Sequence, residues 1–354
     1  MRFMPYLFIY RLLVSYVVEQ LQLFLKSIRS PETRSNYEIL FQKYRDYVSA
    51  EDLFFENNPR LIEKNIIEFI LYLRDQGKSC SAIRNYLTPI KSFYKINDVV
   101  LNDRKILKFL PEQLKVGNDR AYTHEEISKM LEIADERMRA VILLLSSSGI
   151  RIGAIPTLTL GNLQENRLVV YQGTREEYVT FITPEAKKAI DSYLDMRSRY
   201  GEILNDKTCI IREQFDIRDK FAIQNPKILK SHSLAWRLAI VSERSGIRKR
   251  GHDKNKRQNI MVAHGFRKFF TEQCVNAKVN PEIREMLLGH KIGLMSSYYR
   301  PNETDMYEEY QKAEDNLTID PNQRLRKQLK IAMVEKSRLD RMEQKMDQME
   351  KMFH

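Results

Sequence analysis

Cysteine is scarce in this sequence. Its 354 residues include three cysteines, and these lie far apart, at Cys80, Cys209 and Cys274. Disulfide frameworks and structural zinc sites need several cysteines, often at close spacing. The sequence therefore argues against both and indicates a reducing, cytoplasmic setting.

Two motifs of phosphate and metal chemistry are also absent. The chain has neither G-x-x-x-x-G-K-[S/T], whose backbone amides hold nucleotide phosphates, nor H-E-x-x-H, which binds zinc. We therefore expect no cofactor and no metal.

Long uncharged hydrophobic runs are missing as well. The most apolar stretch, residues 1–25, is interrupted by Arg11 and Glu19, and no small-residue cleavage site follows it. A transmembrane helix needs about 20 mainly apolar residues in succession. We interpret residues 1–14 as an apolar packing segment, with a membrane anchor as the alternative.

Positive charge exceeds negative charge. Lys and Arg number 59 against 47 Asp and Glu, which gives a formal net charge of +12. Such an excess is typical of proteins that bind polyanions, although basic membrane-surface proteins share it. We expect nucleic acid to be the partner.

The length predicts two domains and a tail. Residues 15–110 contain amphipathic helical segments, one of them ended by Gly77, and predict a helical bundle. Basic and aromatic residues alternate in this bundle, which is compatible with a DNA clamp and also with an ordinary helix surface. Pro111 and the residues after it interrupt the helical pattern, so we expect a linker at 111–118.

A second domain is expected at 119–318. Thr123 and Glu126 have the spacing of a capping box that begins a helix. Residues 135–148 are too apolar to face solvent and predict a core helix, whereas 167–183 read as a strand, a turn and a second strand. The fold class is therefore mainly α with a small antiparallel β-sheet (α+β).

Basic side chains in this domain occur where they can meet an anion. Arg151 follows a small-residue turn after the core helix and must reach water or an anion, because an unpaired buried guanidinium is costly. Arg175 lies in or beside the turn between the strands. His264 and Arg267 are three residues apart on one predicted helix face and can converge on a phosphate; a polar surface patch is the alternative.

Further along, L-G-H ends in His290, and Tyr299 follows nine residues later. The ordered set of Arg151 in S-G-I-R, H-x-x-R, L-G-H and this tyrosine resembles the tyrosine recombinase family of phage-type integrases. The stretches around Y-Y-R-P and G-T-R-E-E-Y are similar to its archaeal branch. The resemblance implies a SAM-like core-binding domain at 15–110, a catalytic domain at 119–318 and a C-terminal helix.

The resemblance also implies an activity, that of a site-specific recombinase of a mobile element that integrates or excises DNA without metal or ATP. A tyrosine suits a covalent 3′-phosphotyrosine intermediate, and by the family's pattern the nucleophile is Tyr299. Arg151 and Arg267 would hold the phosphate oxygens, His264 would assist proton movement, and His290 would donate to a phosphate oxygen. The implied partners are double-stranded DNA with attachment sites and further protomers, as a tetramer, in the nucleoid.

Three positions leave alternatives open. Ala154 stands where the family usually has a carboxylate, and Arg175 stands where it commonly has a lysine that acts as general acid. A guanidinium is a poor proton donor, so Arg175 would act electrostatically. Adjacent helical residues point about 100° apart, so either Tyr299 or its competitor Tyr298 faces the phosphate. A DNA-binding or architectural protein with weak or no catalysis is the main alternative; a type IB topoisomerase fits the spacing less well.

The tail at 319–354 has apolar residues at alternating three- and four-residue spacing, beginning with Leu325 and Leu329. This pattern predicts a helix, with a coiled coil as one form it could take. Its partner would be another protomer, the body of the same chain, or nothing stable.

Overall fold

The computed structural model describes most of the chain in segments. These are residues 19–48, 58–113, 119–227, 229–248, 259–291 and 301–325, with single positions from 329 to 342. Residues 1–14, part of the predicted linker, and both Tyr298 and Tyr299 lie outside the described residues. Within the described part, no helix is long and apolar enough to span a membrane.

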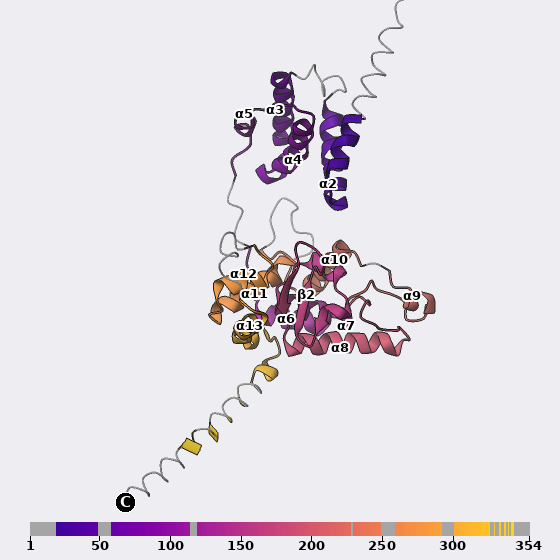
Figure 1. Cartoon of the computed structure of the whole chain (residues 1–354), viewed down its shortest axis with the longest axis vertical. Helices are drawn as coiled ribbons and strands as arrows, with labels where there is room; N and C mark the ends of the chain where they lie inside the picture. Colours follow the sequence, from indigo (N-terminus) through magenta and orange to yellow (C-terminus); the bar gives the residue numbers. More distant parts are fainter. Residues whose placement is uncertain are drawn as a thin grey trace, which may run out of the picture. The chain divides into compact units, whose positions relative to one another are not determined.

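Two compact units make up the chain, Met1–Val116 and Gly117–His354. Both are helical, and the second contains one small antiparallel sheet (Figure 1). The predicted α+β fold class is confirmed.

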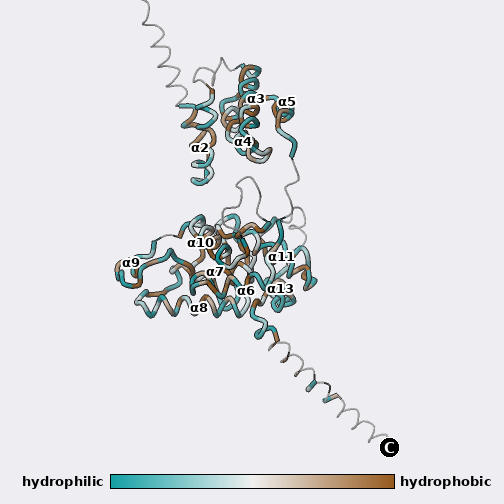
Figure 2. Tube along the Cα trace, turned by 180° about the vertical axis from the view of Figure 1, so that it is seen from behind, coloured by the Kyte–Doolittle hydropathy of each residue, from teal (hydrophilic) through white to brown (hydrophobic). Residues whose placement is uncertain are grey.

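The described part of the first unit contains helical residues 19–27 and the helices α2 (Pro31–Tyr47), α3 (Pro59–Asp75), α4 (Cys80–Ile96) and α5 (Asp103–Leu107). Hydrophobic and hydrophilic residues share the same helices, as expected for amphipathic segments (Figure 2). The buried faces are rich in aromatic residues, and the rings of Phe41 and Phe93 have centroids 4.5 Å apart. Gly77, at φ +71°, follows the end of α3 in the left-handed conformation that glycine favours.

The second unit begins with α6 (His124–Ile133) and α7 (Glu136–Ser148), followed by two short 3₁₀ helices, η2 (Ile152–Thr157) and η3 (Leu160–Asn162). The remaining elements are β1 (Leu163–Gln164), β2 (Arg167–Val170), β3 (Tyr178–Phe181), α8 (Pro184–Arg199), α9 (Lys220–Gln224), α10 (Ser231–Arg244), α11 (His264–Asn276), α12 (Pro281–Leu287) and α13 (Glu303–Leu317). The capping box is present at the start of α6. Glu126 N donates to Thr123 Oγ1 at 3.2 Å, and Thr123 N donates to Glu126 Oε2 at 3.0 Å.

Helix α7 forms the core of the second unit. Helices α6, α8, α11 and α13 pack against it. Even its last turn is buried, because Ser147 and Ser148 are at most 1% exposed. Its serine hydroxyls donate to carbonyls of the preceding turn, which makes this burial tolerable.

The sheet has the strand order β1-β2-β3, antiparallel throughout. Leu168 of β2 pairs with Thr180 of β3, so the turn between these strands extends from the sheet as the sequence predicted. Strand β1 was not predicted, since two residues are too few to show alternation.

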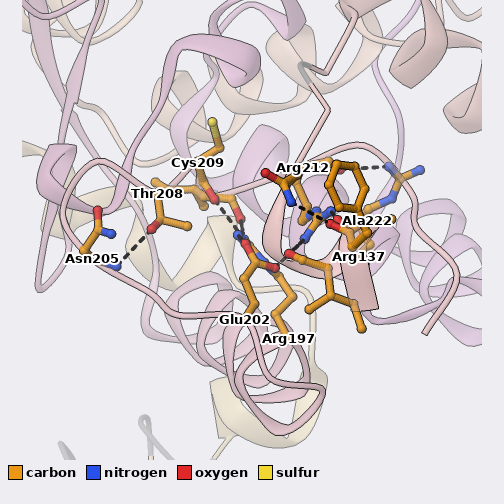
Figure 3. A network of polar contacts seen from close by, with 12 residues as sticks. Arg137, Arg197, Glu202, Asn205, Thr208, Cys209, Arg212 and Ala222 are labelled. Atoms are coloured by element: carbon orange, nitrogen blue, oxygen red, sulfur yellow. Dashed lines mark hydrogen bonds and ion pairs between the residues drawn. The ribbon is translucent and has the colours of Figure 1, made fainter. Parts of the chain in front are cut away.

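A buried ion-pair cluster holds the long connection after α8 (Figure 3). Glu202 accepts hydrogen bonds from Arg197 Nη2 at 2.5 Å and Arg212 Nη1 at 2.7 Å, and all three side chains are at most 4% exposed. Arg197 also donates to the carbonyls of Cys209 and Ile210. Because the Glu202 carboxylate is paired with both arginines inside the protein, we interpret the cluster as structural.

Candidate active site

Arg267 joins three helix ends inside the second unit. It lies one turn into α11 and is 7% exposed. Its Nη1 donates to the Gly149 carbonyl at 2.7 Å, and its Nη2 donates to the Leu288 carbonyl at 2.6 Å. Gly149 and Leu288 are the C-cap residues of α7 and α12, so the guanidinium lies at the negative ends of two helix dipoles. These contacts offset the cost of burying the charge.

Gly149 has two reasons to be glycine. Its φ is +62°, and a Cβ atom at this position would lie 2.6 Å from Cδ1 of Phe270. The chain therefore turns sharply at the end of α7 and brings Arg151 to the surface, where it is exposed. This placement agrees with the expectation that Arg151 reaches water or an anion.

The L-G-H segment is a helix-ending turn with defined hydrogen bonds. Gly289 N donates to the Met286 carbonyl at 2.8 Å, and His290 N donates to the Glu285 carbonyl at 2.9 Å. This pair of bonds is a Schellman motif. Gly289 adopts φ +66°, and a Cβ there would overlap the ring of Tyr178. The turn consequently holds His290 beside β3.

His290 bridges a cation and an anion. Its Nε2 lies 2.7 Å from Arg267 Nη2, and its Nδ1 lies 2.5 Å from Glu285 Oε2. Since a guanidinium has only donors, we assign Nε2 as the acceptor and place the proton on Nδ1. Burial alone would raise the pKa of Glu285, but hydrogen bonds from His290 and Arg284, with their charges, lower it.

An open cavity of about 490 Å³ lies over these groups. It is lined by Arg151, Arg175, Glu176, Glu177, Tyr178, Met286, Gly289, His290 and Lys291. Its volume falls in the usual range for ligand sites, and its basic groups favour an anion. In the described part of the chain, no group of three or more His, Cys, Asp or Glu side chains has an arrangement that could hold a metal ion.

Tyr178 lies next to both arginines of the site. Burial raises the pKa of its hydroxyl, and the charges of Arg267 and Arg151 act in the opposite direction. Burial also lowers the pKa of Arg267, and the neighbouring Arg151 lowers it further. Two like charges held this close, with Arg151 facing the open cavity, form a site that an anion would stabilise.

The structure brings together several of the residues predicted from sequence. Arg151, Arg175 and His290 line the cavity, and Arg267 contacts His290. His264 is the first residue of α11 and is exposed, but it does not line this cavity.

Two positions that departed from the family pattern have clear structural settings. Ala154 is fully buried in η2, and Arg175 lies in the turn between β2 and β3.

Three residues of the site were missed from sequence: Tyr178, Glu285 and Lys291. The sequence pattern could have indicated Glu285. In a Schellman motif, the residue five positions before the histidine of L-G-H contacts that histidine. Tyr178 had no comparable pattern, since its place depends on the sheet.

Comparison with protein families places this site in context. The phage integrase family matches residues 120–305, which is more than half of the chain. Tyrosine recombinase XerA of Pyrococcus horikoshii is 24% identical over 257 residues, covering 70% of this chain and 77% of that protein. Tyrosine recombinase XerD of Oceanobacillus iheyensis is 23% identical over 201 residues, covering 50% and 67%.

Solved integrase structures share the fold. A lambda integrase dimer bound to a core site is 18% identical, with a TM-score of 0.55, covering 81% of this chain and 94% of that one. A lambda integrase tetramer bound to a Holliday junction is also 18% identical, with a TM-score of 0.54, covering 82% and 77%. The family match and the relatives together identify the chain as a member of the phage integrase family and a tyrosine-type site-specific recombinase.

Proposed function

We propose that this recombinase cuts and rejoins double-stranded DNA at specific attachment sites through a covalent 3′-phosphotyrosine intermediate. The observation that carries the proposal is that Arg151 and His290 line one open cavity and that the buried Arg267 contacts His290. A phosphodiester in this cavity would meet Arg151 from the solvent side and the Arg267–His290 pair from the protein side.

Tyr299 is the proposed nucleophile. Its phenolic oxygen attacks the phosphorus, the bond to the 5′-oxygen breaks, and the 5′-oxygen leaves with the electron pair. Negative charge gathers on the non-bridging oxygens, where Arg151 and Arg267 donate charge-assisted hydrogen bonds. His264 takes part in proton movement at the tyrosine. Because the phosphotyrosine keeps the energy of the broken bond, the reverse attack by a 5′-hydroxyl rejoins DNA without ATP.

Arg175 is proposed to act through its charge. Its side chain lines the same cavity as His290 and can stabilise the leaving oxygen. A guanidinium does not readily give up a proton. The alternative function, a DNA-binding or architectural protein with weak or no catalysis, rests on this position and on Ala154, and the family match does not favour it.

The partners and origin of the protein are part of the proposal. The lambda integrase tetramer on a Holliday junction supports assembly as a tetramer on DNA. A DNA-processing enzyme with this charge would act in the cytoplasm at the nucleoid.

Similarity to XerA of Pyrococcus horikoshii supports the archaeal branch of the family, and the bacterial XerD match does not separate the branches. An element-borne integrase remains a proposal, as do the domain limits at residues 14, 110, 118 and 318.

The nucleophile is tested by trapping the covalent intermediate. Wild type, Tyr299→Phe and Tyr298→Phe are incubated with a nicked suicide duplex carrying a candidate attachment sequence, and adducts are separated on a denaturing gel. We expect an adduct with wild type and Tyr298→Phe and none with Tyr299→Phe. Loss only in Tyr298→Phe would reassign the nucleophile. No wild-type adduct on DNA that the protein binds would favour the architectural alternative.

A further inference from the structure

The Schellman motif at the end of α12 carries an unusual side-chain pair. In this motif the third residue from the helix end and the second residue after the cap usually form a hydrophobic contact. Here these positions are Glu285 and His290, and their side chains are 2.5 Å apart at Oε2 and Nδ1. The same two residues are joined by the backbone bond from His290 N to the Glu285 carbonyl. The orientation of the imidazole is therefore set by two contacts to one residue.

This geometry determines which protonation state of His290 can serve the reaction. In the free protein Nε2 accepts from Arg267, and Nδ1 donates to Glu285. A neutral imidazole of this form cannot donate from Nε2. To donate to a phosphate oxygen, His290 must be protonated at both nitrogens. The carboxylate of Glu285, which Arg284 also contacts at 3.1 Å, stabilises that cation.

We propose that Glu285 is a positioning residue that holds the His290 ring through Nδ1, so that a phosphate oxygen can replace Arg267 at Nε2, and that it stabilises the protonated form of His290 during strand cleavage. Ala154, three residues after Arg151, supplies no carboxylate to the site, and Glu285 does supply one. The proposal rests on the proposed function. Charged and titratable groups near His290 are Glu285, Arg284, Arg267, Arg151, Arg175, Glu176, Glu177, Tyr178 and Lys291.

The pH dependence of single-turnover adduct formation tests this role in the full-length protein. Glu285→Gln removes the negative charge with little change in shape, and Glu272→Gln on α11 is an exposed control with the same charge change. We expect Glu285→Gln to slow adduct formation about 10- to 100-fold at neutral pH. We also expect its pH–rate profile to differ from that of the wild type, because the carboxylate that contacts Nδ1 has become a neutral amide. The control should follow the wild type.

A double-mutant cycle separates positioning from a general structural effect. If Glu285 acts through His290, the Glu285→Gln substitution should have little further effect in a His290→Gln background. Additive losses, or an unchanged pH profile in Glu285→Gln, would overturn the proposal. Absence of any wild-type adduct would instead count against the proposed function.

A second inference concerns the proton for the leaving 5′-oxygen. Among the residues lining the cavity, His290 already donates to a non-bridging phosphate oxygen in the role assigned above. The carboxylates are poor acids, Arg151 and Arg175 hold their protons too tightly, and the hydroxyl of Tyr178 is buried. Lys291 is the lysine among them, and it directly follows His290 in an exposed position. An ammonium group has protons that it can donate to an alkoxide.

We infer that Lys291 is the general acid of strand cleavage. When Tyr299 forms its bond to phosphorus and the bond to the 5′-oxygen breaks, the Lys291 ammonium gives that oxygen a proton and becomes a neutral amine. In strand rejoining the same amine accepts the proton of the attacking 5′-hydroxyl, which restores the ammonium.

A substrate with sulfur in place of the bridging 5′-oxygen tests this assignment, because a thiolate leaves without a proton. We expect Lys291→Ala and Lys291→Arg to slow cleavage of normal DNA about 100-fold or more and to cleave the sulfur substrate at near the wild-type rate. Arg151→Ala should stay slow on both substrates, since it stabilises the phosphate itself. Failure of the sulfur substrate to rescue Lys291→Ala, or rescue of Arg175→Ala instead, would overturn the assignment.

Discussion

The Nη2 atom of Arg267 and the Nε2 atom of His290 lie 2.7 Å apart, and the same Arg267 side chain donates to the ends of α7 and α12. A single buried guanidinium thus supports the fold and contacts a residue of the cavity. Arg151, in contrast, is exposed. The two arginines should differ in their effect on stability even if both are needed for cleavage.

Replacing each arginine with alanine separates these roles. Arg267→Ala leaves the carbonyls of Gly149 and Leu288 without a partner, and we expect the free energy of unfolding to fall by about 2–4 kcal/mol. Arg151→Ala should change it by less than about 0.5 kcal/mol. Both variants should lose adduct formation by about 100-fold or more. Urea unfolding followed by circular dichroism measures the free energy of unfolding, and the gel assay measures adduct formation. Equal losses of stability in the two variants would contradict the prediction.

Gly149 should be far less tolerant of substitution than a glycine with the same backbone conformation and open surroundings. Gly246 has φ +76°, and a Cβ atom there would have no atom of the described residues within 4 Å, so Gly246→Ala should cost about 1 kcal/mol. Gly149→Ala must also displace the ring of Phe270, which should add about 1–3 kcal/mol. Urea unfolding of both variants checks the difference, and equal costs would show that the ring moves freely.

Glu202 should stabilise the second unit in a pH-dependent way. Burial alone raises its pKa, but hydrogen bonds and charge from Arg197 and Arg212 outweigh this and lower the pKa below the usual value of 4.5. A lowered pKa in the folded state means that the stabilisation is complete above about pH 4.5 and is lost as the pH falls through the folded pKa.

We expect Glu202→Gln to lower the free energy of unfolding by about 3–5 kcal/mol at pH 7, because it leaves Arg197 and Arg212 buried without their anion. The difference from wild type should narrow below about pH 4.5. Glu213→Gln is the control, since Glu213 is 31% exposed and 4.0 Å from Arg137. Urea unfolding between pH 3 and pH 7 is the measurement; a gap independent of pH would contradict the linkage.

DNA binding should weaken steeply with salt. A net charge of +12 favours many contacts to phosphates, whose counterions are released on binding. We expect the association constant to fall about 100-fold or more between roughly 50 and 200 mM salt. Arg175→Ala should reduce the slope of log K against log salt by about 1 if it contacts a phosphate. Fluorescence anisotropy at several salt concentrations measures the association constant and its slope. An association constant independent of salt would contradict the DNA-binding proposal.

Local sequence patterns predicted much of the secondary structure. The capping box at Thr123 and Glu126, the turn at Gly77 and the core helix before Gly149 are all present, because each depends on residues within one or two helical turns. The ordered residues of the site also predicted the family without knowledge of the fold. Tyr299, on which the chemistry depends, lies outside the described residues, so its assignment stays a proposal.

The sequence by itself determined which side chains can carry the chemistry and which helices present them, since caps, glycine turns and hydrophobic periodicity act between near neighbours. Only the tertiary structure decided that Arg267 is buried between the ends of α7 and α12, at Gly149, 118 residues away, and Leu288, 21 residues away. It likewise placed Tyr178 against Gly289 and Glu285 against His290. Such contacts arise because α11 packs against α7 while α12 packs against β3 and α11, and spacing along the chain carries no direct measure of that packing.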